Sequence, residues 1–166
     1  MKKKIKRAKG KLGILVHGLG SAAATTFISG VEAIKKGLAE PVGSLTQAGN
    51  ILMDKKTGTG YSKLKEYISL ANIKDIVFGG WDTHNDDLFA VAVKAQIVQP
   101  GLLQQLKPEL EKIVPMKAFE GFIPELNTVD VKLKQDKFEF AKQVMYDIEN
   151  FSAANNCTRL IVICFA

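Results

Sequence analysis

The sequence predicts an α/β protein in which helices flank a mostly parallel sheet. Short apolar runs alternate along the chain with longer amphipathic stretches, which gives the order strand, helix, strand, helix. Strands that are apolar on both faces are typical of parallel sheets, because helices cover both faces of such sheets. The 166 residues, 46% of them hydrophobic, suffice for one domain with a substantial core.

The first expected strand leads directly into the first expected helix. Leu12 to Val16 is apolar and ends at a His-Gly pair, which predicts a buried strand. From Ala22 apolar residues recur at helical spacing until a glycine and a proline bracket the end of the pattern. Residues 42–53 are then expected to be extended chain broken by glycine, and Asp54 to Lys63 to be a polar loop.

The second half of the chain repeats this order. Ile76 to Phe78 predicts a strand that the pair Gly79-Gly80 is expected to break, and the apolar residues between Leu88 and Ile97 predict a helix after it. The segment GLLQQLKPELEKIV predicts a further helix, interrupted by Pro108, and the segment PMKAFEGFIPEL is expected to be irregular.

A long helix from Lys137 and a last strand complete the expected fold. Asn155-Asn156 is expected to end this helix, whose apolar stripe consists of Phe138, Ala141, Val144, Met145, Ile148 and Phe151. The final RLIVICFA predicts a strand that is apolar on both faces. A parallel strand normally leads into a loop at its carboxyl end, so the sequence is expected to be a fragment, incomplete at its C-terminal end.

The turn after the first strand has the spacing of a dinucleotide-binding loop. Gly18-x-Gly20-x-x-Ala23 matches the G-x-G-x-x-A pattern between an expected strand and an expected helix. Gly18 would permit the tight turn, Gly20 would let the backbone approach a pyrophosphate, and Ala23 would let the helix pack closely on the strand. The amides at the helix N-terminus would then receive the phosphates. The alternative is a turn with a purely structural role.

The pattern also calls for an acidic residue about 20 residues further on, which would hold a ribose hydroxyl. Glu40 lies at about that distance, but Pro41 follows it, and the next strand begins later. We therefore expect Glu40 to be a solvated loop carboxylate.

The net charge of +6 is concentrated in one short segment. Residues 1–11 hold seven of the 23 lysines and arginines, and the rest of the chain has 16 basic against 17 acidic residues. This basic arm could bind nucleic acid or an anionic membrane, but it has no interleaved aromatic residue and no basic stripe continues it. We expect a solvated terminus, with no nucleic-acid partner, no membrane span and no signal peptide.

Cys157 and Cys164 form neither a disulfide framework nor a zinc motif, and they are expected to be reduced thiols of a cytoplasmic protein. His84 among Asp82, Asp86 and Asp87 suggests a metal site, but the spacing is not that of a known hard-metal loop. We expect a helix start that acidic residues favour, and no metal.

His17 is expected to be structural, and Trp81 to pack against the sheet.

Three blocks of sequence give the chain a family resemblance. These are the glycine turn within GLGSAAATTFISGVEAIKK, the block GSLTQ at Gly43 to Gln47, and the block GGWD at Gly79 to Asp82. Together with PMKAF and the helix leading to RLIVICFA, they occur in the order found in myo-inositol-phosphate synthases of bacterial type. The chain resembles the amino-terminal, NAD-binding part of these enzymes over everything after the basic arm, which implies a Rossmann-like domain over residues 12–166 and an arm over residues 1–11.

The resemblance implies an isomerase that uses NAD without net redox change. Such enzymes convert D-glucose 6-phosphate to 1D-myo-inositol 3-phosphate by oxidation at C5, enolisation, intramolecular aldol closure and reduction. The nicotinamide supplies the redox chemistry, while protein groups orient the transfer and stabilise the enolate. The full-length enzymes serve inositol and phospholipid biosynthesis, act on a sugar phosphate and are expected to be homo-oligomers.

The resemblance assigns cofactor contacts and no catalytic residue. The residues that match the family's phosphate-cradling loop are Gly18, Leu19, Gly20, Ser21, Ala22 and Ala23. Asp82 matches an aspartate that contacts the NAD, and Asp82 could also cap a helix. The catalytic lysines of the family are expected beyond the matched part, so none is assigned here.

Three alternatives stay open. The chain could be a stand-alone nucleotide-binding module without catalysis, a fragment of another NAD-dependent dehydrogenase, or an interaction protein that acts through its basic arm.

Overall fold

A parallel four-stranded sheet forms the centre of the molecule. The computed structural model describes residues 9–52, 60–118 and 137–165. The strands are β1 (Lys11–His17), β4 (Ile76–Asp82), β5 (Met116–Lys117) and β6 (Cys157–Cys164), and they lie in the order β5-β4-β1-β6. All three neighbouring pairs are parallel, as the sequence predicts.

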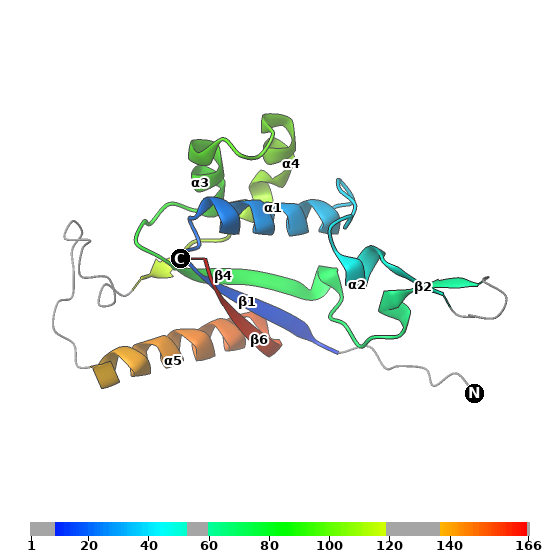
Figure 1. Cartoon of the computed structure of the whole chain (residues 1–166). Helices are drawn as coiled ribbons and strands as arrows, with labels where there is room; N and C mark the ends of the chain where they lie inside the picture. The colour runs from blue at the N-terminus through cyan, green and yellow to red at the C-terminus, as the bar shows by residue number, and fades with distance from the viewer. Residues whose placement is uncertain (1–8, 53–59, 119–136, 166) are drawn as a thin grey trace.

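Helices cover both faces of this sheet. The helices α1 (Ala22–Lys35), α3 (Leu88–Ala95) and α4 (Pro100–Leu110) lie on one face, and α5 (Lys137–Asn155) lies on the other (Figure 1). A smaller part at the side consists of α2 (Leu45–Ala48) and the antiparallel pair β2 (Asn50–Leu52) and β3 (Tyr61–Lys63). Two 3-10 turns, Leu64–Glu66 and Ile73–Asp75, lead from it to β4.

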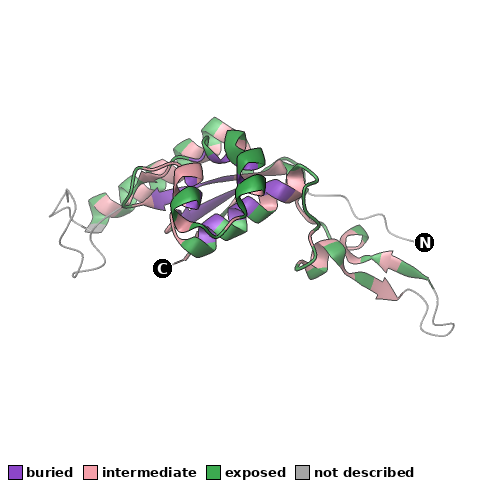
Figure 2. Cartoon of the chain, turned by 90° about the horizontal axis from the view of Figure 1, so that it is seen from above, coloured by how far each residue is buried: buried purple, intermediate pink, exposed green. Residues whose placement is uncertain are grey.

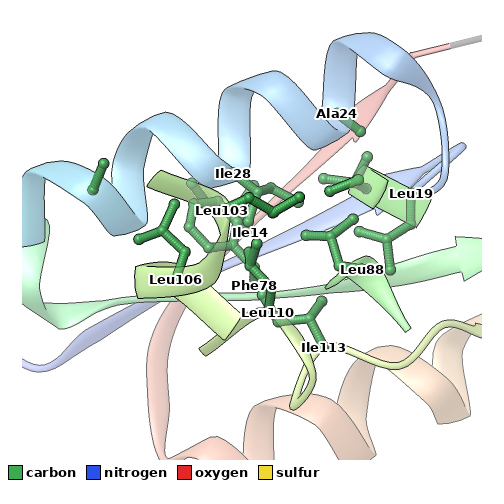
Figure 3. Packing of buried hydrophobic residues seen from close by; sticks show 13 residues of the cluster. Ile14, Leu19, Ala24, Ile28, Phe78, Leu88, Leu103, Leu106, Leu110 and Ile113 are labelled. Atoms are coloured by element: carbon green, nitrogen blue, oxygen red, sulfur yellow. The ribbon is translucent and has the colours of Figure 1, made fainter. Parts of the chain in front are cut away.

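The hydrophobic core lies between the sheet and the three helices on its first face (Figures 2 and 3). Ile14 and Phe78 of the sheet belong to one hydrophobic cluster with Ile28 of α1 and Leu106 of α4. These side chains are nearly or fully buried, as the apolar patterns of the sequence predict. In contrast, no residue of α2, β2 or β3 is buried.

The second face of the sheet has a thinner cover. In α5, Phe138 and Met145 have exposed fractions of 63% and 59%, so these two members of the predicted apolar stripe do not face the sheet. Phe151 does face it, because a Cβ atom on Gly13 or Gly79 would meet its ring. The helix extends to Asn155, and Asn156 follows it at a φ of 54°, so the predicted end of this helix is confirmed.

The strand β6 is less buried than its apolar sequence predicts, because it lies at the edge of the sheet. Ile161 and Val162, on opposite faces of the strand, are 47% and 54% exposed, because β1 alone pairs with β6 in the described part of the chain. In the described residues no helix is long and apolar enough to cross a bilayer.

Three expected elements differ from the structure. Gly79-Gly80 does not break the second strand, which continues to Asp82. A Cβ atom on Gly80 would overlap the carbonyl oxygen of Val16. Glycine at this position therefore permits the close approach of β4 to β1, and it does not mark the end of the strand. The block GSLTQ, expected to be extended, contributes its last three residues to the short helix α2, and the expected loop to Lys63 ends in the strand β3.

The other differences concern α4 and the segment after it. Pro108 does not interrupt α4, which continues through it to Leu110 and buries Leu103, Leu106 and Leu110. Met116 and Lys117 of the expected irregular segment pair with the end of β4, and the rest of that segment lies outside the described residues. Residues 54–59 of the expected polar loop, residue 53 before it and residues 1–8 of the basic arm also lie outside them.

We predict that Gly80→Ala destabilises the protein strongly. The new Cβ atom would overlap backbone atoms of Val16, which cannot move without disturbing the β1–β4 pairing. Overpacking of this kind costs about 1–3 kcal/mol of unfolding free energy, measurable by urea denaturation.

Gly101→Ala is the matched control. A Cβ atom at this helical position meets nothing within 4 Å, so alanine should raise stability by about 0.5–1 kcal/mol through its better helix propensity. Equal unfolding midpoints for Gly80→Ala and the unmodified chain would contradict the close approach.

Candidate cofactor site

The candidate site lies where β1 and β4 end side by side. In the pairing of these strands His17 is opposite Trp81, so the turn after β1 starts next to the carboxyl end of β4. The amides of Gly18 and Leu19 both donate to the carbonyl oxygen of Trp81, at 3.0 and 3.2 Å. Gly18 has a φ of +81°, a conformation that favours glycine. The turn therefore starts with a geometry that its sequence can adopt without strain.

Asp82 is joined directly to the glycine turn. Its Oδ2 accepts a hydrogen bond of 2.7 Å from the amide of Gly20. Its Oδ1 accepts from the amide of His84 at 3.2 Å, so one carboxylate ties the turn to the loop after β4. A Cβ atom on Gly20 would lie 3.1 Å from Oδ2, which is tighter than an ordinary contact. The absence of a side chain at Gly20 therefore leaves room for the Asp82 carboxylate, in addition to any room it leaves for a ligand.

The first turn of α1 has free amides that point out of the helix end. Ser21 caps the helix, because its Oγ accepts from the amide of Ala24 at 3.2 Å. The amides of Ala22 and Ala23 have no acceptor within the described residues, and both residues are exposed. Free amides and the positive end of the helix dipole together attract anions. A pyrophosphate group fits this position, since small side chains flank it.

The predicted site residues do not all have the same role. Leu19 is 1% exposed and belongs to the core, so only its backbone is at the turn. The enclosed space beneath the turn measures about 10 Å³, which is enough for about one water molecule. A dinucleotide would therefore lie along the open end of the sheet rather than inside a closed pocket.

The acidic residues after β4 each bind a different partner and do not form one cluster. Asp87 accepts from the amide of Ala90 at 2.8 Å and caps α3, so the helix cap considered for Asp82 belongs to Asp87 instead. Asp86 forms an ion pair of 2.5 Å with Lys94. In the parts of the chain that the structure covers, no group of three or more histidine, cysteine or acidic residues could hold a metal ion.

Two further contacts at this end of the sheet were not foreseen. Nδ1 of His17 lies 3.6 Å from Sγ of Cys164, because β1 and β6 end in register. Trp81, expected to pack against the sheet, is instead a residue of β4 itself. It is buried, and its Nε1 donates to Oδ2 of Asp147 in α5 at 2.9 Å. Asp147 belongs to no sequence motif, so only its position in the long helix could have indicated that it contacts Trp81. Both cysteines are free, and burial raises the pKa of the Cys157 thiol.

Comparison with known proteins identifies relatives of the chain. A family model described as the NAD-binding part of myo-inositol-1-phosphate synthase matches residues 12–166. The chain is 40% identical to inositol-3-phosphate synthase 1 of Bacteroides thetaiotaomicron over 98% of its own length and 38% of that relative. It is 29% identical to inositol-3-phosphate synthase isozyme 1 of Arabidopsis thaliana over 92% of its length and 33% of that relative.

A solved structure has the same fold. Inositol-3-phosphate synthase from Caenorhabditis elegans superposes with a TM-score of 0.80 and 22% identity, over 95% of this chain and 34% of that one. The chain therefore has a Rossmann-like NAD-binding fold and spans little more than a third of the length of the relatives it matches.

We predict that Asp82→Ala loosens the glycine turn. Loss of the carboxylate leaves the Gly20 amide without its acceptor, which should cost about 1.5–3 kcal/mol of unfolding free energy, as for hydrogen bonds to charged groups. The exchange of the Gly20 amide hydrogen, followed by NMR, should become faster.

Asp82→Asn is the control, because its side-chain oxygen can still accept from the Gly20 amide. Its unfolding midpoint and exchange rate should stay closer to those of the unmodified chain. If Asp82→Ala left both quantities unchanged, the carboxylate would not hold the turn.

Proposed function

Because the chain belongs to the myo-inositol-1-phosphate synthase family, of which it represents the NAD-binding part, we propose that the glycine turn, the start of α1 and Asp82 form its cofactor site. The observation that carries this proposal is the pair of amides at Ala22 and Ala23, which have no partner among the described residues, beside a glycine turn that Asp82 holds in place. These groups lie together at the carboxyl ends of parallel strands, where ligands of such sheets bind.

The residues divide the recognition of NAD between them. The amides of Ala22 and Ala23 bind the pyrophosphate, aided by the helix dipole. Gly20 permits close approach of the phosphates because it has no side chain. The carboxylate of Asp82 accepts from a ribose hydroxyl while it keeps its bond to the Gly20 amide. Asp82 thus takes the role that the exposed Glu40 cannot take.

We further propose that the complete protein converts glucose 6-phosphate to inositol 3-phosphate. Bound NAD would accept a hydride from the sugar and return it, so the reaction would leave no net NADH. The residues of this chain orient the cofactor in that reaction. The groups that close the ring and stabilise the enolate belong to the part of the relatives that this chain does not match, so no catalytic residue is assigned here.

The organisation of the protein is also proposed on these grounds. Residues 12–166 form the NAD-binding domain and residues 1–11 a separate basic arm. The complete protein acts in the cytoplasm, because its described cysteines are free, and assembles as a homo-oligomer, as the family resemblance implies. Neither nucleic acid nor a membrane is proposed as a partner, because the basic arm has no interleaved aromatic residue and no basic stripe continues it.

The test is NAD binding by calorimetry on the chain and on Gly20→Val. The valine side chain would crowd Oδ2 of Asp82 and the position of the pyrophosphate, so we expect at least a tenfold loss of affinity, which corresponds to about 1.4 kcal/mol. Gly30→Ala is the control, because its Cβ atom meets nothing within 4 Å further along the same helix.

Equal NAD affinity in Gly20→Val and Gly30→Ala, with both variants folded by circular dichroism, would contradict the assigned site. Absence of NAD binding to the unmodified, folded chain would mean that the turn has a structural role alone in this chain.

A further inference from the structure

A second cavity lies at the opposite end of the sheet from the cofactor site. It measures about 350 Å³ and lies between the end of α1, α2 and the segment that leads from β3 to β4. Lys35, which lines it, donates to the carbonyl oxygen of Ile76, the first residue of β4. The cavity is therefore at the amino end of this strand, whereas the glycine turn is at the carboxyl end (Figure 1).

The charged side chains of this cavity are mostly lysines. They are Lys35, Lys63, Lys65 and Lys74, against the single acid Glu40. Lys35 is neutralised by an ion pair of 2.6 Å with the buried Glu32. For the other three lysines no carboxylate partner is found among the described residues, which leaves the cavity with an unbalanced positive charge.

The walls between the lysines combine apolar and polar residues. The apolar residues are Ile34, Pro41, Ala48, Ile68, Leu70, Ala71 and Ile73, and the uncharged polar residues are Gln47 and Asn72. A volume of about 350 Å³ is at the lower end of the range of small-molecule sites, which also combine apolar walls with a few charged groups. A concave surface with an excess of one sign of charge concentrates the electric field more strongly than a flat one. A small ligand therefore fits better here than an extended polymer.

We propose that this cavity binds a small phosphorylated molecule, with its phosphate held by Lys63, Lys65 and Lys74 and its uncharged ring against the apolar wall. A phosphate dianion relieves the mutual repulsion of three ammonium groups, and lysine binds phosphate as a compact point charge. The cavity contains neither the glycine turn nor Asp82. Ligand binding in the cavity can therefore be tested independently of NAD binding at the cofactor site.

The test is calorimetric titration of the full chain with glucose 6-phosphate as the probe. We expect saturable binding of one molecule, no detectable binding of glucose, and at least a tenfold loss of affinity in Lys63→Gln/Lys65→Gln. The control Lys112→Gln/Lys142→Gln removes the same charge from residues that do not line the cavity, and it should bind within twofold of the unmodified chain. Equal weakening in both double variants would overturn the proposal, because the effect would then come from net charge.

A second pair of variants tests the location. Ala71→Leu keeps every lysine but occupies part of the cavity, so it should weaken binding, whereas Gly20→Val should leave it unchanged. If the probe bound Ala71→Leu normally, or failed to bind Gly20→Val, it would sit outside this cavity. Absence of saturable binding to the unmodified chain would also overturn the proposal.

Discussion

The parallel pairing of β1 with β4 is the constraint on which the rest of the structure depends. Its register places His17 opposite Trp81, so both strands end at the same level. The chain can then turn back over the Trp81 carbonyl oxygen, which accepts the first two amides of the turn. Without this register Gly20 would not reach Asp82, and α1 would not begin beside the end of β4. The close approach itself requires Gly80, because any side chain there would meet Val16.

The sequence alone predicted the parts of the fold that local patterns determine. The strand before the turn, α1, α3 and the long α5 follow from periodicity, and the glycine turn follows from its spacing between a strand and a helix. The continuation of β4 through Gly79-Gly80 could not be predicted. A glycine pair is typical of a strand end and also of a strand that lies close to its neighbour, and the local sequence does not distinguish the two. The deciding neighbours, Phe151 and Val16, are distant in sequence from these glycines.

The sequence singled out residues that the structure brings together at the candidate site, but not the bonds between them. Ala23, which was expected to pack closely on the strand, is exposed. The pattern singled out Gly20 and the family resemblance singled out Asp82, yet the bond between them joins residues 62 positions apart and depends on strand register. The same holds for Leu19, whose place in the motif does not reveal that its side chain belongs to the core. Glu40 is exposed, as expected for a solvated loop carboxylate, but nothing in the sequence indicated that it lines a cavity with four lysines.

The two ends of the sheet differ in how they could hold an anion. At the carboxyl end backbone amides and a helix terminus are available, and their positions are fixed by strand pairing. At the amino end the positive groups are lysine side chains around a cavity that lies partly within the less buried part of the molecule. The first arrangement suits a cofactor whose geometry must be precise, and the second suits a ligand recognised by charge and size.

The central claim is that the free amides at the start of α1 receive the cofactor phosphates. The most direct measurement is an NMR titration of the isotope-labelled chain with NAD, in which each backbone amide is followed separately. We predict saturable shifts that are largest for the backbone amides of Gly20, Ala22 and Ala23, with those of Lys65 and Lys74 unaffected. Shifts centred on those lysines, or saturable binding that leaves the amides of Ala22 and Ala23 unchanged, would contradict this claim.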